Sequence, residues 1–327
     1  MKIRKQLIHP RPKGRGFLRE KDKNNPPRTY FLKRLIWCLE KQKLEEEKVF
    51  AEGVLSLLYH PRFDKLIKSR LFKRLLSKFY GAYQNTALSS LKIKKFIRNF
   101  SINPEEFPTL DQYRSFNDFF MRPFNEQMRP FSQGWNFPAF AEGRYLIFEG
   151  VKATDELNIK GQNISLSGLC AQELEKSGKY SILICRLAIQ DYHRFHFFDE
   201  GTLLEIKRVD GHLHSVGPQS AYRVKDIYLG NTRFISKLSC RHFTTVHMVE
   251  VGALCVGSIR QFKKPGEDFV RGEEKGLFQF GGSTVIAILP DNKIKFNKDI
   301  LDQSRHGIET LVKLGTSLGI GIDEHNN

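Results

Sequence analysis

The residues best suited to chemistry form a short segment at 281–284, which reads Gly-Gly-Ser-Thr and runs directly into the apolar stretch 285–289. A serine that follows a glycine at the start of a strand can attack the carbonyl carbon before it, because Gly282 has no side chain to block the approach. Two glycines before a strand more often form an ordinary turn or bulge. Ser283 is therefore a candidate nucleophile that needs support from a second group.

Two histidines lie in the segment 191–196, which reads Asp-Tyr-His-Arg-Phe-His and follows an apolar run at 180–189. The run predicts a buried strand, so His193 and His196 are expected at its end, where functional groups often gather. Residues three apart in an extended chain face opposite sides, so these imidazoles suit separate tasks better than one metal ion. A serine hydroxyl is a weak nucleophile without a nearby base, so a catalytic role for the pair and a structural one are equally supported at this point.

Five blocks of the sequence resemble phosphatidylserine decarboxylase proenzymes, and they occur in the order found in that family. The blocks are 116–120 with 129–130, 191–196, 251–259, 271–278 and 281–286. No motif in the first hundred residues can be matched to the family. The resemblance implies a pyruvoyl-dependent decarboxylase that is made as a precursor.

The resemblance also implies how the cofactor is made and which residues act. The serine of the motif attacks the preceding carbonyl, which implies self-cleavage between Gly282 and Ser283 into a β chain, 1–282, and an α chain, 283–327. Ser283 then becomes a covalent pyruvoyl group that forms a Schiff base with phosphatidylserine and takes up the electrons left by carbon dioxide, so no free cofactor is needed. The family pattern assigns the processing base to His196 and a part in decarboxylation to His193.

The sequence departs from the family at Glu142, where the usual Pro-Ala-Asp-Gly motif is replaced by Phe-Ala-Glu-Gly at 140–143. We expect Glu142 to accept a hydrogen bond from His196 and to orient it. Glutamate is one methylene longer, and a misplacement of about 1 Å can slow a reaction roughly a hundredfold. Two interpretations stay open, an active enzyme and a processing-deficient relative that retains only lipid-surface binding. A second departure, Lys275 in place of the usual methionine, concerns packing.

Positive charge is concentrated in the first hundred residues, which hold 26 of the 53 lysines and arginines but only 8 of the 36 acidic residues. The remainder of the chain is close to neutral. This asymmetry indicates an anionic partner, either a nucleic acid or a lipid surface. The basic leader has few aromatic residues and no recognisable nucleic-acid module, so a nucleic-acid partner is not expected.

Apolar residues recur at steps of three and four from Arg62 to Tyr80, between lysines and arginines, and predict a basic amphipathic helix. Such a helix can lie at a bilayer surface or pack on the catalytic body. A second apolar cluster at 31–39 suits either a membrane interface or a short buried helix. Neither has the roughly 18 uninterrupted apolar residues that span a bilayer, so we expect peripheral attachment to the cytoplasmic face of the cell membrane.

The composition predicts four parts. Residues 1–28 are expected to be a flexible basic leader, and residues 29–100 a helical membrane-associating region. Prolines interrupt a connector at 101–135. Residues 136–327 are expected to form the catalytic domain, which is long enough for a substantial core.

Short apolar segments separated by turn residues predict a mostly β, sandwich- or barrel-like catalytic body, and together with the helical region an α+β fold. The expected strands are 144–150, 180–189, 202–209, 244–260 and 284–289. Apolar spacing predicts a final helix over 300–318. The chemistry requires Glu142, His196 and Ser283 to meet in space, which strands that share one end permit.

The five cysteines are widely spaced, and several lie in apolar runs, as expected for reduced structural thiols of a cytoplasmic protein. We expect no metal site, since His212 and His214 have no third ligand nearby. The expected partners are phosphatidylserine, an anionic membrane surface, and the α and β chains of one precursor. The sequence leaves a homo-oligomer open.

Overall fold

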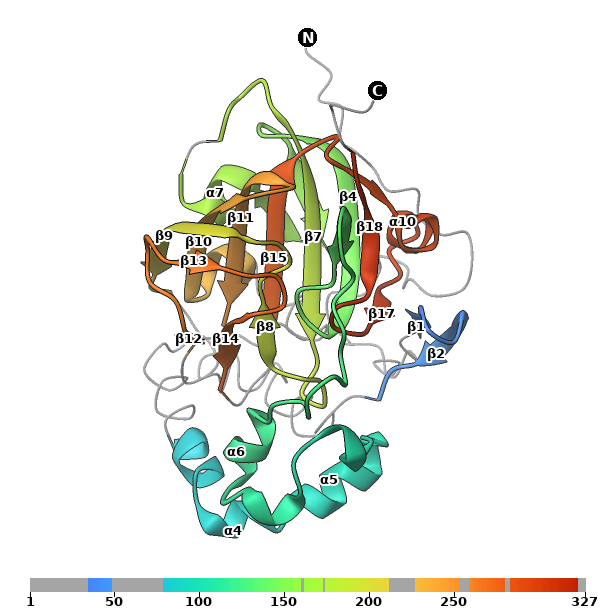
Figure 1. Cartoon of the computed structure of the whole chain (residues 1–327), viewed down its shortest axis with the longest axis vertical. Helices are drawn as coiled ribbons and strands as arrows, with labels where there is room; N and C mark the ends of the chain where they lie inside the picture. Colours follow the sequence, from blue (N-terminus) through green and yellow to red (C-terminus); the bar gives the residue numbers. More distant parts are fainter. Residues whose placement is uncertain are drawn as a thin grey trace, which may run out of the picture.

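The computed structural model describes residues 35–48, 79–159, 162–172, 174–211, 227–252, 259–279 and 283–322. Several predictions lie outside these residues: those for the flexible leader, for the amphipathic stripe 62–80 apart from its last two residues, for His212 and His214, and for the backbone at Gly282. The predicted α+β class is confirmed, because the described residues form a large β body with a few short helices beside it (Figure 1).

A mixed sheet of ten strands forms the centre of the described structure. β15 lies between β7 and β11 and pairs antiparallel with both. In order across the sheet the strands are β13 (Asp268–Phe269), β9 (Gly201–Val209), β10 (Arg233–Cys240), β11 (Thr244–Val251), β15 (Ser283–Pro290), β7 (Lys179–Leu187), β4 (Gly143–Lys152), β17 (Thr310–Val312), β1 (Leu35–Cys38) and β2 (Lys43–Glu46).

The central strands β7 and β15 are buried on both faces of the sheet. This explains why their sequences are nearly continuous apolar runs. Along β7, Leu183 and Cys185 belong to one core, while Ile182 and Ile184 belong to the core on the other face. The first core is covered by two three-stranded sheets, and the second by a hairpin and short helices. These covering strands are β12 (Ile259–Gln261), β14 (Glu274–Phe278) and β8 (Arg194–His196); β16 (Ile294–Phe296), β18 (Ser317–Gly321) and β3 (Asn136–Pro138); and β5 (Glu156–Ile159) with β6 (Gln162–Ser165).

Three short helices lie beyond the end of the sheet near β8 and β14 (Figure 1). They are α4 (Ala87–Ser90), α5 (Ile93–Phe100) and α6 (Phe116–Phe120), and the aromatic side chains of α5 and α6 share one small core. α6 begins after Ser115, whose hydroxyl accepts a hydrogen bond from the backbone N–H of Asp118 at 3.1 Å. Further α-helices among the described residues are α7 (Leu166–Cys170), α9 (Ile227–Gly230) and α10 (Lys298–Arg305). Among the described residues, no helix has the length and apolar character needed to cross a bilayer.

Two sequence-based predictions of secondary structure are wrong in part. Residues 35–46, expected to be helical, form the β1–β2 hairpin, because β1 pairs in parallel with β17 at the sheet edge and gains hydrogen bonds there. A short apolar run does not distinguish a buried helix from a strand. The final segment is helical only over α10, after which Gly307 and Gly315, both with positive φ, help the chain turn into β17 and β18.

All five expected strands are present. The segment 244–260, expected to be one strand, takes in β11, which ends at Val251, and the start of β12, which begins at Ile259.

Candidate active site

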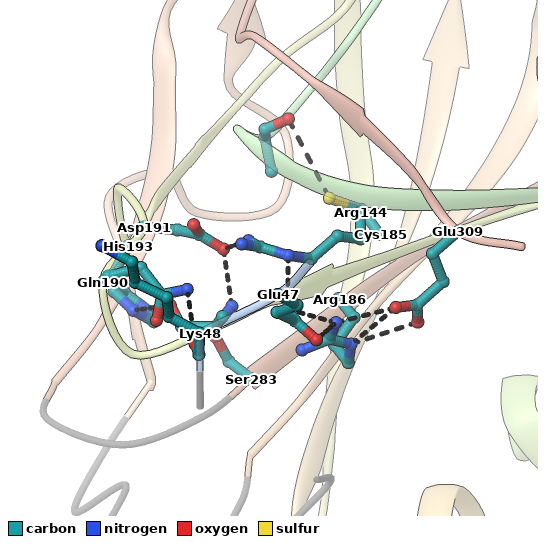
Figure 2. Close-up of polar contacts among 12 residues, drawn as sticks. Glu47, Lys48, Arg144, Cys185, Arg186, Gln190, Asp191, His193, Ser283 and Glu309 are labelled. Atoms are coloured by element: carbon teal, nitrogen blue, oxygen red, sulfur yellow. Dashed lines mark hydrogen bonds and ion pairs between the residues drawn. The ribbon is translucent and has the colours of Figure 1, made fainter. Parts of the chain in front are cut away.

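Ser283 and His193 meet at one end of the central strands. Ser283 is the first residue of β15, opposite Leu187 at the end of β7, and its side chain is fully buried. Its Oγ lies 3.3 Å from Nδ1 of His193, in the loop between β7 and β8 (Figure 2). Within the described part of the chain, this imidazole is the only hydrogen-bond partner of the Ser283 hydroxyl.

The hydrogen bonds of His193 fix which ring nitrogen carries the proton. Nε2 lies 3.0 Å from the carbonyl oxygen of Ala188, which can only accept. Nε2 therefore donates, and the unprotonated Nδ1 faces the Ser283 hydroxyl as an acceptor. Burial, together with the nearby Arg122 guanidinium, lowers the pKa of His193 from 6.5 to about 3. The ring is neutral at pH 7 and has the geometry of a general base.

The helical connector supports His193 from the side. The ring of Phe120, at the end of α6, stacks on the imidazole with 3.8 Å between centroids. Arg122 follows α6 and donates to the backbone carbonyls of Gln190 and Asp191, at 3.0 and 3.2 Å. The loop that carries the candidate base is therefore packed against a segment that sequence reasoning assigned to the connector.

A buried cluster of five charged side chains lies beside the serine (Figure 2). The Arg144 guanidinium contacts Glu47, with Nε 2.6 Å from Oε1, and also donates to the Asp191 carboxylate. Arg186 donates to Glu47 and to Glu309, each at 2.7 Å. Two guanidinium groups thus share three carboxylates from distant parts of the chain.

His196 has a different environment, three residues further along on β8. Its Nδ1 donates to the carbonyl oxygen of Gly272 at 2.9 Å, and its Nε2 lies 3.2 Å from the hydroxyl of Tyr192. Its ring also packs near Phe131. Burial lowers the pKa of His196 as well. In the described conformation His196 is therefore bonded to Tyr192 and Gly272, and His193 occupies the position next to Ser283.

The predicted contact between Glu142 and His196 is wrong. The Glu142 carboxylate accepts two hydrogen bonds from Arg129, at 2.6 and 3.0 Å, and one from the backbone N–H of Leu314 at 3.1 Å. The glutamate is drawn away because Arg129 is itself almost buried and requires a carboxylate partner. The structure thus brings Ser283 and His193 together and places Glu142 in a separate ion pair.

Comparison with known proteins decides the family. A model of the phosphatidylserine decarboxylase family matches residues 116–320. The phosphatidylserine decarboxylase proenzyme of Clostridium novyi (strain NT) is 38% identical over 287 residues, 85% of this chain and 97% of that protein. The proenzyme of Chlamydia felis (strain Fe/C-56) is 38% identical over 283 residues, 85% and 95% of the two chains. The chain belongs to the phosphatidylserine decarboxylase family. It is therefore a decarboxylase, and the resemblance seen in the sequence is confirmed.

Gly143 follows Glu142 as the glycine follows the acidic residue in the family motif, and a close contact between two strands explains why this residue is a glycine. A Cβ atom at Gly143 would lie 2.7 Å from the carbonyl oxygen of Arg186 and 2.8 Å from the sulfur of Cys185. Only glycine lets β4 approach β7 so closely. This contact places Arg144 next to Arg186 in the sheet register.

Lys275, the second departure, is fully buried on β14. Its Nζ donates to Glu250 at 2.9 Å and to Ser236 and Gln261 at 2.8 Å. All three donor positions of the ammonium are therefore used. The lysine is accommodated by a matched polar network from β10 and β11 of the large sheet and from the neighbouring strand β12.

Sequence reasoning missed the charged cluster around the serine. One signal was available, since Arg186 interrupts an otherwise apolar strand and a buried guanidinium requires carboxylate partners. Its partners Glu47 and Glu309 could not be found, because nothing in their local sequence points to a common site.

The remaining expectations concern the histidine pair 212 and 214, the backbone at Gly282, metal binding and the cysteines. His212, His214 and Gly282 lie outside the described residues. Within the described ranges, no group of three or more His, Cys, Asp or Glu side chains could hold a metal ion. Four of the cysteines are described, and all four are buried free thiols.

Proposed function

We propose that this chain is the precursor of a phosphatidylserine decarboxylase that cuts itself between Gly282 and Ser283. The observation that carries the proposal is the 3.3 Å approach of the Ser283 hydroxyl to the unprotonated Nδ1 of a neutral, buried imidazole. The names of the relatives, which combine a decarboxylase with a proenzyme, support the same conclusion.

The cut needs one base and one water molecule. Nδ1 of His193 takes the proton of Ser283, whose Oγ attacks the carbonyl carbon of Gly282; the C–N bond breaks, and the nitrogen takes up the proton, which leaves an ester. Removal of the Cα proton of residue 283 then expels the Gly282 carboxylate and leaves an unsaturated residue. Its imine form adds water and loses ammonia, so the new chain begins with a ketone. Atoms balance with one water consumed and no oxidant required.

The site fits this group because residue 283 is enclosed beside a neutral imidazole and is shielded from solvent. The ketone supplies an electron sink for the decarboxylation of an amine substrate, here phosphatidylserine. His193 lies beside this ketone and is the candidate to position the substrate; to act as proton donor to the carbon that loses carbon dioxide, its Nδ1 must first take up a proton. Phe120 holds its ring in place by stacking.

The fold keeps the two proposed products together. β15 would be the first strand of the α chain, and it pairs along its length with β7 and β11 of the β chain. The buried ion pair between Arg186 and Glu309 also joins the two chains. We expect them to separate only when the protein unfolds.

We also propose peripheral attachment to the cytoplasmic face of the cell membrane, with the α4–α5 region at the lipid surface. Phe79, Leu88 and Leu91 are 71, 70 and 79% exposed, and the exposed Lys94 and Lys95 follow on α5. Exposed apolar groups beside cations fit the surface of an anionic bilayer. Flotation with vesicles that contain phosphatidylserine tests this contact: Leu88→Asp with Leu91→Asp should release the protein, whereas Leu204→Asp on β9 should not.

The cleavage proposal is tested by intact-mass measurement of purified protein. Wild type and the control Ser239→Ala, an exposed serine on β10, should both yield fragments 1–282 and 283–327, the smaller with a ketone at its start. Ser283→Ala should stay whole and inactive. A wild-type protein that stays whole and does not release carbon dioxide would instead be the processing-deficient relative, whereas decarboxylation by an uncut chain would overturn the mechanism.

A further inference from the structure

We propose that a buried chain of ion pairs, Glu47–Arg144–Asp191, positions the loop that holds His193 against Ser283. The N-terminal hairpin is then part of the processing machinery, because it supplies Glu47. The inference rests on the proposed function, since it assigns a task to these residues in the cleavage at Ser283.

Asp191 holds the loop before His193 through two contacts with Ala188. Asp191 binds Ala188 twice: its carboxylate accepts from the Ala188 N–H at 2.6 Å, and its own N–H donates to the Ala188 carbonyl at 2.9 Å. The same carbonyl accepts from Nε2 of His193 at 3.0 Å. Asp191 therefore sets the position of the atom that fixes the tautomer and direction of the imidazole.

A side chain of the central sheet also contacts this loop. Arg144, on β4, donates to the Asp191 carboxylate, and its side chain is only 4% exposed. Arg122 binds the backbone carbonyls of Gln190 and Asp191 from the side of α6. The loop is thus held by one arginine through a side chain and by another through its backbone.

The N-terminal β1–β2 hairpin is linked to the same ion pairs through Glu47. Glu47 follows β2, and its side chain is 2% exposed between the two guanidinium groups of Arg144 and Arg186. Without this carboxylate, the two buried cations would have only Asp191 and Glu309 as partners in the cluster. Loss of this carboxylate removes the one group that contacts both arginines and leaves the Arg144 Nε without its acidic partner, so Arg144 is expected to shift and to carry Asp191 with it.

The test compares Glu47→Gln with Glu45→Gln, a change on the same hairpin in a partly exposed glutamate that pairs with Lys41. The rate of appearance of fragment 283–327 is measured from about pH 5 to about pH 8. We expect Glu45→Gln to mature like wild type, with a flat profile. Glu47→Gln should mature at least about tenfold more slowly, as expected for a misplaced catalytic group.

The pH profile separates positioning from general support. The charged groups around His193 are Arg122 on the side of α6, Arg144 on β4 and Asp191 in its own loop, while Ser283 faces it from β15. An imidazole that has lost its fixed place regains access to water, and its protonation should then abolish maturation below a midpoint at about pH 6.5. Asp191→Asn, which keeps an acceptor for Ala188 but loses the charge facing Arg144, should show the same acid limb.

Three results have distinct meanings. Equal rates for Glu47→Gln and Glu45→Gln overturn the inference. So does a slower Glu47→Gln with a flat profile and a lowered melting temperature in the uncleavable Ser283→Ala background, because that pattern shows structural support alone. A wild-type chain that stays whole refutes the proposed function instead.

Discussion

His193 and His196 lie three residues apart and have chemically similar environments, but only His193 lies beside Ser283. Both rings are buried, both have a lowered pKa, and in both a backbone carbonyl accepts the proton of one ring nitrogen. The free nitrogen of His193 faces Ser283, whereas that of His196 faces the hydroxyl of Tyr192.

The comparison teaches that burial and tautomer do not select the base. A candidate base must lie within reach of the proton that it removes. The loop before β8 carries His193 to the start of β15, while pairing of β8 with β14 holds His196 opposite Glu274. β8 begins at Arg194, between the two histidines. His193 therefore stays in the loop beside Ser283, whereas His196 is held on the strand away from it.

The largest expected effect is on the rate of maturation, and it tests directly which of the two histidines is the base. His193→Asn should slow maturation by roughly 10²–10⁴-fold, the contribution of a general base, whereas His196→Asn should cause a smaller loss. Time courses of fragment formation on denaturing gels measure both variants. The reverse ranking would show that the precursor rearranges to bring His196 to Ser283, as the family pattern implies.

A second prediction uses the pKa of His193. The unfolded chain binds a proton on this histidine below about pH 6.5, and the folded precursor does not bind it until about pH 3. The contribution of this group to stability is therefore present above the unfolded pKa and is lost as pH falls. The Ser283→Ala precursor should lose about 2 kcal/mol between pH 7 and pH 5 from this residue, as measured by denaturant unfolding.

The control for this prediction is the double variant Ser283→Ala with His193→Asn. It should show a smaller loss over the same pH range, with the contribution of His196 unchanged. An equal slope in the two proteins would mean that His193 does not titrate on unfolding.

The smallest expected effect on processing concerns Glu142. Glu142→Gln weakens the ion pair with Arg129 and should lower the free energy of unfolding by roughly 1–3 kcal/mol while maturation proceeds at the wild-type rate. Chemical denaturation of the Ser283→Ala background and a maturation time course measure the two quantities. A roughly hundredfold slower cut with unchanged stability would instead restore Glu142 to the catalytic group.

Much of the fold could be predicted from local sequence. The strands β7 and β15 are nearly continuous apolar runs, and β4, β9 and β11 are mixed segments with apolar residues bounded by turns, so their type and approximate bounds follow from the sequence pattern. The β1–β2 hairpin could not, because its strand conformation depends on pairing with β17 at the edge of the sheet. The family, Ser283 as nucleophile and the two histidines likewise followed from motifs.

The sequence by itself determined the chemical groups and the strands that carry them, because residue type and periodicity are local properties. Only the tertiary structure decided that His193 lies beside Ser283, that Glu142 binds Arg129, and that Glu47 reaches Arg144. Such contacts depend on strand order and on the pairing of buried charges, and several arrangements of those charges are compatible with the same local sequence.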